Sequence, residues 1–360
     1  MMGYENNVRK VIPYTPGEQP SGRVIKLNTN ESPYPPAPGV FKALNESDPS
    51  DLRRYPDPTC SGLVSALADF YGLKESQVFA GVGSDDVLSM CFLTFFNGKD
   101  PVLFPDITYS FYDVWAEVYR IPYRTIPLTE DFSIDPEDYK GEKNGGIVIA
   151  NPNAPTGVAE DLSIIEDIIR SNPDVLVIVD EAYIDFGGES ALPLLSKYEN
   201  MIIVRTMSKS RSLAGMRIGY AFGSEKVIKY LNDVKYSVNS YTMNMPSLKA
   251  GAAAVEDDEY FRETVSKIKA TREWTKGQLK ELGFEFRDSA ANFIFATHEG
   301  VLPGEKRSDL AKRIFESLKE RDIYVRYFPK PRIDGYLRIS IGTDEEMRTF
   351  TEALKEIITR

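Results

Sequence analysis

A lysine among hydroxyl-bearing residues follows one of the apolar runs of the chain. Residues 201–204 are predicted to form a strand, Lys209 comes just after it, and Arg217 follows eight residues later. Burial and a nearby cation lower the pKa of a lysine and make its amine a nucleophile toward carbonyl groups. Thr206, Ser208 and Arg217 carry the groups that hold a phosphate. The alternative for so short a motif is a surface turn, so the choice depends on the residues with which the lysine is combined.

A carboxylate ends another apolar run, residues 175–179. Asp180 stands at the tip of this predicted strand, where an unpaired buried charge is costly, so it requires a cation. A protonated pyridine nitrogen would serve, and Tyr183 offers a phenol on roughly the same side. The rigid polar turn at residues 151–157 closes the preceding strand, and Tyr109 at a helix start is placed to lie flat on a planar ligand. A purely structural turn and a core aromatic are the alternatives for these last two features.

A glycine-containing loop precedes the helix expected after a short strand at residues 77–80. Ser84 is the expected N-cap, and Asp85 and Asp86 lie in the first turn, where the helix dipole favours negative charge. Such a loop presents free backbone N–H groups to an anion, although similar turns often serve only as helix entries. The dinucleotide-binding pattern is not met, because its third glycine falls on Asp86.

These residues fall at the ends of strands that alternate with helices. The predicted strands cover residues 77–80, 102–104, 146–150, 175–180, 201–204 and 218–222, with predicted helices at residues 109–119 and 163–171. The runs 147–149 and 175–179 are continuously apolar, as is typical of strands covered on both faces. The pattern predicts a doubly wound α/β sheet, which binds its ligands at the carboxyl ends of the strands.

The pattern changes near residue 256. A long charged helix is predicted over residues 257–282, and the short strands and amphipathic helices that follow it indicate a second, smaller α+β domain. We therefore expect three parts. They are an N-terminal arm that packs with the small domain (residues 1–30), a large domain (residues 31–255) and the small C-terminal domain (residues 256–360).

Composition restricts the classes of function. The 360-residue chain has a net charge of −11, which argues against nucleic-acid binding. Cys60 and Cys91 are expected to be core thiols of a reducing compartment. No apolar run approaches the ~18 residues that span a bilayer and no leader is visible, so we expect a cytoplasmic protein without membrane contact. The single histidine, His298, excludes a histidine-rich metal site and disfavours a catalytic triad, and no metal is expected.

Taken together, the motifs resemble those of the pyridoxal-phosphate-dependent aminotransferases with the aspartate-aminotransferase fold, and among them the class II histidinol-phosphate aminotransferases. The similarity covers nearly the whole chain and rests on spaced motifs at residues 28–36, 54–56, 151–157, 180–183, 208–219 and 338–343. It implies fold type I, in which a mainly parallel seven-stranded sheet is sandwiched by helices in a large domain, next to a smaller α+β C-terminal domain. It also implies pyridoxal 5'-phosphate as the cofactor.

The resemblance also implies a role for each cofactor-binding residue. Lys209 would form the Schiff base with the cofactor, and Asp180 would pair with the pyridinium nitrogen. Tyr183 would hydrogen-bond the phenolic oxygen of the ring, and Tyr109 would stack on the ring. The cofactor phosphate would be held by the backbone N–H groups of Ser84 and Asp85, the side chains of Thr206, Ser208 and Arg217, and Tyr55 from the neighbouring subunit. The contribution of Tyr55 would make a homodimer a condition of activity.

One position departs from the commonest family pattern. The turn usually carries a second asparagine before Pro-Thr-Gly, where it bonds the phenolic oxygen, and this chain has Ala154 there. Either Asn153 takes over that contact or Tyr183 makes it alone. We predict the contact with Asn153.

Arginines of the small domain are expected to select the substrate. Arg338 inserts a charge into an apolar strand pattern, for which a surface-facing side chain is the alternative. The resemblance implies that Arg338 and Arg326 bind the substrate phosphate or the carboxylate of glutamate, because guanidinium groups suit both anions. Tyr14 and Asn30 would contribute to the same pocket.

The resemblance implies transamination of L-histidinol phosphate with 2-oxoglutarate, which yields imidazole acetol phosphate and L-glutamate in L-histidine biosynthesis. An aromatic amino-acid aminotransferase or a threonine-phosphate decarboxylase on the same fold is the runner-up. A non-catalytic, cofactor-binding regulator would need an added DNA-binding or partner domain, and the length and the acidic charge speak against one.

Overall fold

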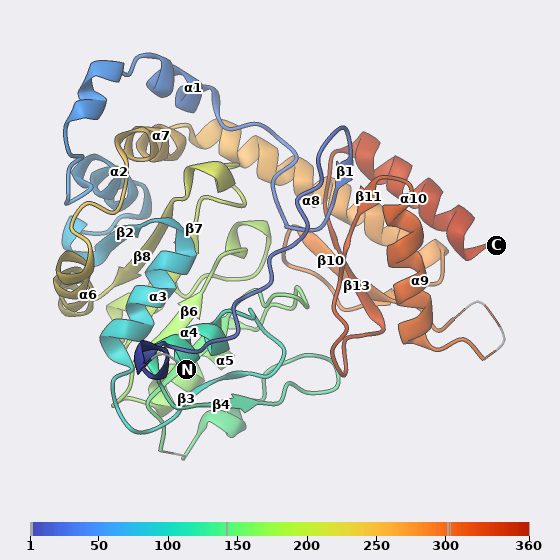
Figure 1. Ribbon diagram of the computed structural model, residues 1–360, viewed down its shortest axis with the longest axis horizontal. Coiled ribbons are helices and arrows are strands. Elements are labelled where there is room, and N and C mark those ends of the chain that lie inside the picture. Colours follow the sequence, from blue (N-terminus) through green and yellow to red (C-terminus); the bar gives the residue numbers. More distant parts are fainter. Residues whose placement is uncertain (1–2, 142, 301, 303, 360) are drawn as a thin grey trace.

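Two β-sheets of unequal size organise the computed structural model (Figure 1). It describes residues 3–141, 143–300, 302 and 304–359. The ends of the predicted arm and small domain (residues 1–2 and 360) therefore lie outside the described residues, as do residues 142, 301 and 303. The larger sheet has the strand order β2-β8-β7-β6-β5-β3-β4, and the smaller one has the order β12-β13-β10-β9. A separate parallel pair joins β1 to β11.

The strands of the larger sheet are β2 (Val78–Gly81), β3 (Val102–Pro105), β4 (Tyr123–Ile126), β5 (Gly146–Ala150), β6 (Val177–Asp180), β7 (Met201–Thr206) and β8 (Gly219–Gly223). The helices around it are α1 (Pro38–Asn45), α2 (Ser61–Tyr71), α3 (Gly83–Phe95), α4 (Tyr112–Tyr119), α5 (Leu162–Ser171), α6 (Glu225–Val238) and α7 (Met245–Glu256). Short 3-10 helices are η1 (Gly3–Asn7), η2 (Pro49–Arg53), η3 (Glu75–Gln77), η4 (Pro136–Tyr139), η5 (Ile184–Phe186), η6 (Leu192–Ser196) and η7 (Ala214–Met216).

The remaining strands are β1 (Ile25–Lys26), β9 (Glu285–Phe286), β10 (Phe293–Thr297), β11 (Ile323–Tyr324), β12 (Arg326–Tyr327) and β13 (Tyr336–Ser340). The remaining helices are α8 (Asp258–Glu281), α9 (Arg307–Lys319) and α10 (Asp344–Ile358). In Figure 1 the long helix α8 runs from the side of the larger sheet to the side of the smaller one.

The larger sheet is covered by helices on both faces, and its central strands β5, β6 and β7 are buried at every position. In β5, Ile147 and Ile149 pack into one core with residues of α2, α5 and α7, whereas Val148 packs into another with residues of α3, α4 and α6. Strands β3 to β7 pair in parallel, and β8 runs antiparallel to both β2 and β7. This mainly parallel, seven-stranded sandwich confirms the predicted α/β architecture.

Three local predictions need correction. Strand β4 was not predicted, because three of its four residues are exposed and the edge strand lacks an apolar run. Helix α3 begins at Gly83 without a side-chain cap, so Ser84 is a first-turn residue and not the N-cap. The helix expected from residue 109 begins at Tyr112, which leaves Tyr109 on the preceding loop.

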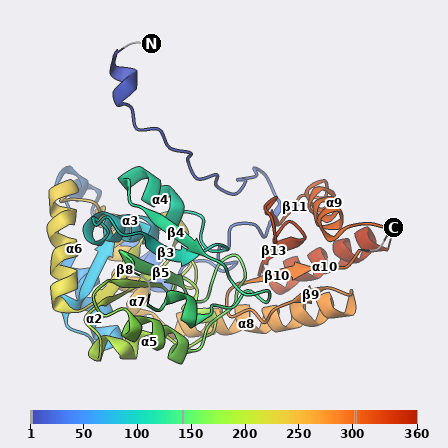
Figure 2. The same ribbon diagram turned by 90° about the horizontal axis from the view of Figure 1, so that it is seen from below.

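The residues before β1 form an extended arm that runs out from the body of the molecule (Figure 2). Side chains of two distant parts of the chain contact it. The guanidinium of Arg326 donates hydrogen bonds to the carbonyl oxygens of Thr15 (3.2 Å) and Pro16 (3.4 Å). Tyr14 instead stacks on Phe111 at the start of α4, with ring centroids 4.2 Å apart. Within the described part of the chain, no helix is long and apolar enough to cross a membrane.

Candidate active site

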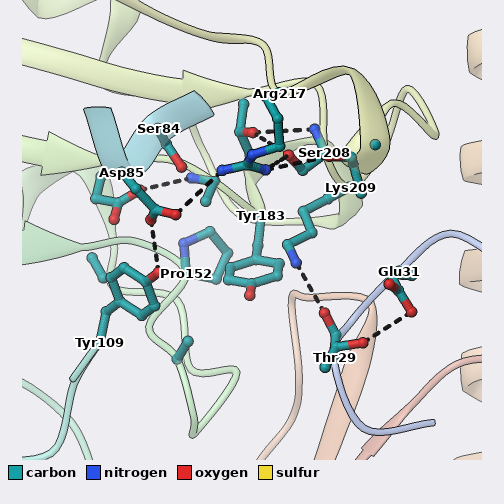
Figure 3. A pocket seen from close by; sticks show the side chains of 17 residues that line it. Thr29, Glu31, Ser84, Asp85, Tyr109, Pro152, Tyr183, Ser208, Lys209 and Arg217 are labelled. Atoms are coloured by element: carbon teal, nitrogen blue, oxygen red, sulfur yellow. Dashed lines mark hydrogen bonds and ion pairs between the residues drawn. The ribbon is translucent and has the colours of Figure 1, made fainter. Parts of the chain in front are cut away.

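Polar side chains from several strand ends meet in one cavity of about 340 Å³ at the carboxyl edge of the larger sheet (Figure 3). Its walls are formed by Thr29, Glu31, Ser84, Asp85, Tyr109, Ala150, Pro152, Ala154, Asp180, Ala182, Tyr183, Thr206, Ser208, Lys209, Ala214, Gly215 and Arg217. The lysine and the aspartate that the sequence singled out on separate strands thus face the same space.

Asp180 is the last residue of β6 and is almost completely buried. Its Oδ2 accepts a hydrogen bond from the phenol of Tyr112 (2.8 Å), and its Oδ1 accepts one from the backbone N–H of Ala182 (3.1 Å). Burial raises the pKa of Asp180 to about 6, although both hydrogen bonds act in the opposite direction. Because these donors are neutral, the site favours a ligand that brings a positive charge to this carboxylate.

Lys209 follows β7 and extends its amine to the backbone carbonyl oxygen of Thr29, 3.0 Å away (Figure 3). Burial and the guanidinium of Arg338 lower the pKa of Lys209 to about 8. A substantial fraction of the amine is therefore neutral near pH 8. A neutral amine can attack a carbonyl group or accept a proton, which a typical surface lysine does poorly at this pH.

Tyr183 is held in place from the side of the smaller sheet. Its phenol oxygen accepts a hydrogen bond from Nδ2 of Asn30 (2.9 Å), and its ring packs edge-to-face on Phe293, with centroids 5.1 Å apart. Asn30 is itself buried, and its Oδ1 accepts a hydrogen bond from the hydroxyl of Ser340 (2.8 Å). The structure therefore makes Asn30 a support for Tyr183, and its predicted substrate contact stays a prediction.

Hydroxyl, guanidinium and backbone N–H groups gather at one end of the cavity. The hydroxyl of Thr206 donates to that of Ser208 (3.0 Å), which also accepts a weaker contact from Nη1 of Arg217 (3.4 Å). Ser84 and Asp85 lie in the first turn of α3, where backbone N–H groups have no partner within a helix. This combination suits a phosphate-sized anion.

Two glycines allow the backbone to close around this anion site. Gly83 has a φ of +84°, and a Cβ there would lie 2.5 Å from Nη2 of Arg217. At Gly219, the first residue of β8, a Cβ would lie 2.4 Å from the backbone nitrogen of Ser84. Side chains at either position would push Arg217 or the start of α3 away from the cavity.

The side chain of Asp85 connects the anion site to Tyr109. Its Oδ1 accepts a hydrogen bond from the phenol of Tyr109 (2.8 Å), and its Oδ2 pairs with Nη2 of Arg217 (3.3 Å). Burial and this carboxylate raise the pKa of Tyr109 well above its ordinary value, so the phenol stays a donor. The side chain of Asp85 thus orients Tyr109 and Arg217. This role is additional to the phosphate contact that was predicted for its backbone N–H group.

Arg338 brings a half-buried guanidinium close to the cavity. Its Nη2 donates to the carbonyl oxygen of Asn28 (2.9 Å), and its Cζ lies 5.4 Å from the ring centroid of Phe293 and 5.5 Å from that of Phe328. Burial lowers the pKa of Arg338. Its Nε is buried and has no hydrogen-bond partner among the described residues. A half-buried, incompletely satisfied guanidinium favours an anionic ligand.

Arg326 and Tyr14 line a different hollow, of about 1100 Å³, between the arm, the start of α4 and the loop that follows β12. The contacts of Arg326 with the arm and of Tyr14 with Phe111 hold the arm across this hollow. The structure therefore places these two predicted substrate residues beside the 340 Å³ cavity and not in its wall.

The predicted contact of Asn153 with a ligand is not supported by the structure. Its Oδ1 accepts a hydrogen bond from Thr108 (2.8 Å), and its Nδ2 donates to the carbonyl of Ile107 (2.9 Å) and the hydroxyl of Thr156 (3.1 Å). The amide is thus engaged inside the turn, and it is Ala154 that lines the cavity. Of the two alternatives, the geometry favours Tyr183 acting alone.

Tyr55 lies outside the cavity of its own chain. Its side chain is 79% exposed and stacks on Tyr241, with ring centroids 4.5 Å apart. Such an exposed aromatic pair leaves the phenol of Tyr55 free to meet another surface, but this chain alone does not bring it to the anion site.

Two site residues escaped the sequence analysis. Tyr112, which donates to Asp180, is the first residue of α4, and its contact with the end of β6 depends on tertiary packing that the sequence does not show. The backbone carbonyl of Thr29 accepts a hydrogen bond from the amine of Lys209, so the type of its side chain could not have predicted this contact. Together these residues place three groups around one cavity: the nucleophilic amine of Lys209, the carboxylate of Asp180, which favours a cationic ligand, and the anion site.

Comparisons with known proteins agree with this chemistry. A family model described as aminotransferase class I and II matches residues 22–354. A histidinol-phosphate aminotransferase of Clostridium botulinum (strain Okra / Type B1) is 49% identical over 362 residues and covers 100% of both chains. One of Brachyspira hyodysenteriae (strain ATCC 49526 / WA1) is 50% identical over 355 residues and covers 98% of each chain.

A solved structure is similar over nearly the same span. The histidinol-phosphate aminotransferase of Sinorhizobium meliloti, in complex with pyridoxal-5'-phosphate, matches 93% of this chain and 91% of its own. The TM-score is 0.84 and the sequence identity is 26%. The arrangement of both sheets is therefore shared with a protein known to bind that compound.

Proposed function

This chain belongs to the class I and II aminotransferase family, and from this premise we propose that it is a pyridoxal-phosphate-dependent histidinol-phosphate aminotransferase. It transfers the amino group of L-histidinol phosphate to 2-oxoglutarate, giving imidazole acetol phosphate and L-glutamate in L-histidine biosynthesis. The observation that carries the proposal is the meeting of Lys209 and Asp180 in one cavity beside an anion site.

The residues of the cavity fit pyridoxal phosphate by their own chemistry. Asp180 is a buried carboxylate with neutral donors, which matches a protonated pyridine nitrogen. The amine of Lys209, with its pKa lowered to about 8, matches an aldehyde. Thr206, Ser208 and Arg217 match a phosphate, together with the first turn of α3. When bound, pyridoxal phosphate supplies an electron sink for the charge left on the substrate carbon after its proton is removed.

Each remaining residue of the site has a proposed task in holding the cofactor. Tyr183 would bond the phenolic oxygen of the ring while Asn30 fixes its phenol, and Tyr109 would lie on the ring while Asp85 fixes its orientation. The N–H groups of Ser84 and Asp85 would face the phosphate. These assignments use side chains whose orientation is already fixed by neighbours, so little ordering is needed on binding.

Lys209 is the proposed general base and acid of the reaction. With cofactor and substrate bound, Nζ of Lys209 would be the group placed to take up the proton of the substrate carbon and to give it back. Arg338 contributes by helping to keep the pKa of this amine near 8, so that the neutral form is available. The carbonyl of Thr29 offers the freed amine a hydrogen-bond acceptor within the same cavity.

Arg338 is the proposed anchor for the anionic end of both substrates. Its Nε, which has no hydrogen-bond partner among the described residues, and its desolvated position support bidentate binding of a phosphate or a carboxylate. Arg326 and Tyr14 would join it from the neighbouring hollow, where they line the wall. The two half-reactions would use this group one after the other, with the first product leaving before the second substrate binds, which is the order that defines ping-pong kinetics.

A donor screen of the purified protein tests the function. With 2-oxoglutarate as acceptor, we expect kcat/KM for L-histidinol phosphate to exceed that for phenylalanine by at least about 100-fold, because the more highly charged phosphate gains more from Arg338 than the single charge of a carboxylate does. Threonine phosphate is the matched control, because it carries the same anion without the imidazole. Preference for phenylalanine, or release of carbon dioxide from threonine phosphate, would contradict the proposal and favour the runner-up activities.

We also propose that the enzyme works as a homodimer in which Tyr55 reaches the anion site of the partner. Tyr55 is far more exposed than a packed aromatic, and exposed apolar side chains occur on nearby segments: Phe41, Leu52, Tyr236, Val238 and Tyr241. A surface of this kind supports association with a second copy, because self-complementary patches favour twofold dimers.

Mixing two inactive variants tests the shared site. We expect Tyr55→Ala and Lys209→Ala proteins, unfolded and refolded together, to regain about a quarter of the wild-type sites, because half of the dimers are hybrids with one intact site. The measurement is steady-state activity of the mixture against each variant treated alone. No gain on mixing would place Tyr55 in the site of its own subunit, or outside any site.

The organisation and location of the enzyme are proposed on simpler grounds. The hydrophobic cores support the division into residues 31–255 and 256–360, with residues 1–30 as the arm, because most members of each core come from one of the two larger parts. Phe295 and Ile333 join the core of the larger sheet, and Phe186 joins that of the smaller one. The buried free thiols of Cys60 and Cys91 support the cytoplasm, where thiols stay reduced.

A further inference from the structure

We infer that Tyr112 is a positioning residue for the cofactor, holding the carboxylate of Asp180 ionised and aimed at the ring nitrogen. The inference rests on the proposed function and deepens it, because it assigns the group that prepares Asp180 for its partner. The resemblance to aminotransferases gave Tyr112 no role, and its side chain does not line the cavity.

The hydrogen bonds of Asp180 fix both oxygens of its carboxylate. Oδ2 accepts from the phenol of Tyr112 at 2.8 Å, and Oδ1 accepts from the N–H of Ala182 at 3.1 Å. Two donors on different oxygens prevent rotation of the carboxylate plane. The second donor is part of the backbone, so Tyr112 is the side chain on which this orientation depends.

The phenol of Tyr112 cannot easily leave its position. Its ring is fully buried and lies among four aromatic neighbours, with centroids 5.8 to 6.3 Å away: Phe92, Phe104, Tyr109 and Trp115. Two of these neighbours, Phe104 and Tyr109, meet it edge-on. Rings packed in this way hold one rotamer, so the hydroxyl is set before any ligand arrives.

The charges around Asp180 make a dedicated donor necessary. The carboxylates of Asp85, from α3, and of Glu181, the next residue in the chain, both act to raise the pKa of Asp180, as does burial. The phenol of Tyr112, from α4, and the backbone N–H of Ala182 act in the opposite direction, and the phenol of Tyr183, whose pKa is also raised, is neutral. Burial and Asp180 together raise the pKa of Tyr112 well above its ordinary value, so it remains a donor throughout the working pH range.

A Tyr112→Phe variant removes the hydroxyl and keeps the ring. We expect the holoenzyme to bind pyridoxal phosphate about tenfold more weakly at pH 7.5, because hydrogen bonds to charged groups are worth roughly that factor. We also expect cofactor loss on acidification to begin about one pH unit higher than in the wild type. Without the donor the pKa of Asp180 rises, so its carboxyl becomes protonated at a higher pH. Because a protonated carboxyl cannot pair with a cationic ring, the loss of cofactor shifts to higher pH.

The measurement is the fraction of cofactor retained after dilution of the holoenzyme into buffers from pH 5 to pH 9, read from visible absorbance. Tyr139→Phe is the matched control, since Tyr139 is equally buried in the same domain and its hydroxyl has no hydrogen-bond partner among the described residues. The control should retain cofactor as the wild type does. Far-UV circular dichroism of all three proteins should coincide.

Unchanged retention and an unchanged pH midpoint in Tyr112→Phe would overturn the inference. A variant that loses its fold would overturn it as well, because the hydroxyl would then serve the core and not the ring nitrogen. These results are distinct from a failure of the proposed function, which would appear in the wild type as an absence of bound pyridoxal phosphate or of histidinol-phosphate turnover.

Discussion

Lys209→Ala is expected to lower the turnover of L-histidinol phosphate by about 10⁴-fold or more and to abolish covalent attachment of the cofactor. The lysine has two tasks that no neighbour can take over. Its amine, with a pKa lowered to about 8, is the nucleophile for the aldehyde of the cofactor, and it is also the proposed proton carrier. Among the described residues that line the cavity, Lys209 is the only lysine, so the variant leaves no substitute amine there.

Covalent attachment can be measured apart from activity. Borohydride reduction followed by mass spectrometry should add one cofactor mass to the peptide with Lys209 in the wild type and none in the variant. Lys229→Ala serves as the control, because Lys229 is exposed on α6 and pairs with Asp233. Cofactor still reducibly attached in Lys209→Ala would show that a different amine is the nucleophile.

Arg338→Ala is expected to lower kcat/KM for L-histidinol phosphate roughly 30- to 4000-fold, which corresponds to a loss of about 2–5 kcal/mol of transition-state binding free energy. The large effect follows from desolvation: the guanidinium lies near two aromatic rings, and its buried Nε has no hydrogen-bond partner among the described residues. A further, smaller part of the loss is expected from Lys209, because removing the nearby cation raises the pKa of its amine.

The two half-reactions separate these contributions. Both L-histidinol phosphate and 2-oxoglutarate should lose affinity if Arg338 binds both anions, and the alkaline shift of the pH profile reports on Lys209. Arg348→Ala is the control. Arg348, on α10, also lies over an aromatic ring, that of Trp274, but it does not line either cavity. Unchanged kcat/KM for the phosphate substrate would place Arg338 outside the binding pocket.

Residues at strand ends could be predicted from the sequence because the strands themselves are unambiguous. Continuous apolar runs located β5, β6 and β7, and parallel strands bring their carboxyl ends to one edge. Lys209 and Asp180 follow directly from this register, and the structure places both in one cavity. Strand β4 lacked such a run, since an edge strand with one exposed face needs few apolar residues.

Contacts inside turns and between distant segments could not be predicted in this way. Asn153 and Ala154 are neighbours, and only the path of the turn decides which side chain faces the cavity and which bonds Thr108. Asn30 reaches Tyr183 across 153 residues of chain, and its role as a support depends on Ser340 in β13. These outcomes are set by side-chain direction and tertiary packing, for which residue type and spacing carry no signal.

The burial of Asp180 also links cofactor supply to the lifetime of the enzyme. Its pKa is raised from 3.8 to about 6, so above that pH the ionised carboxyl destabilises the cofactor-free fold by about 3 kcal/mol. Binding a cation at this carboxylate removes the penalty and adds the affinity of the cofactor itself. Newly made chains in a cell short of pyridoxal phosphate would therefore open more often and be degraded by proteases first.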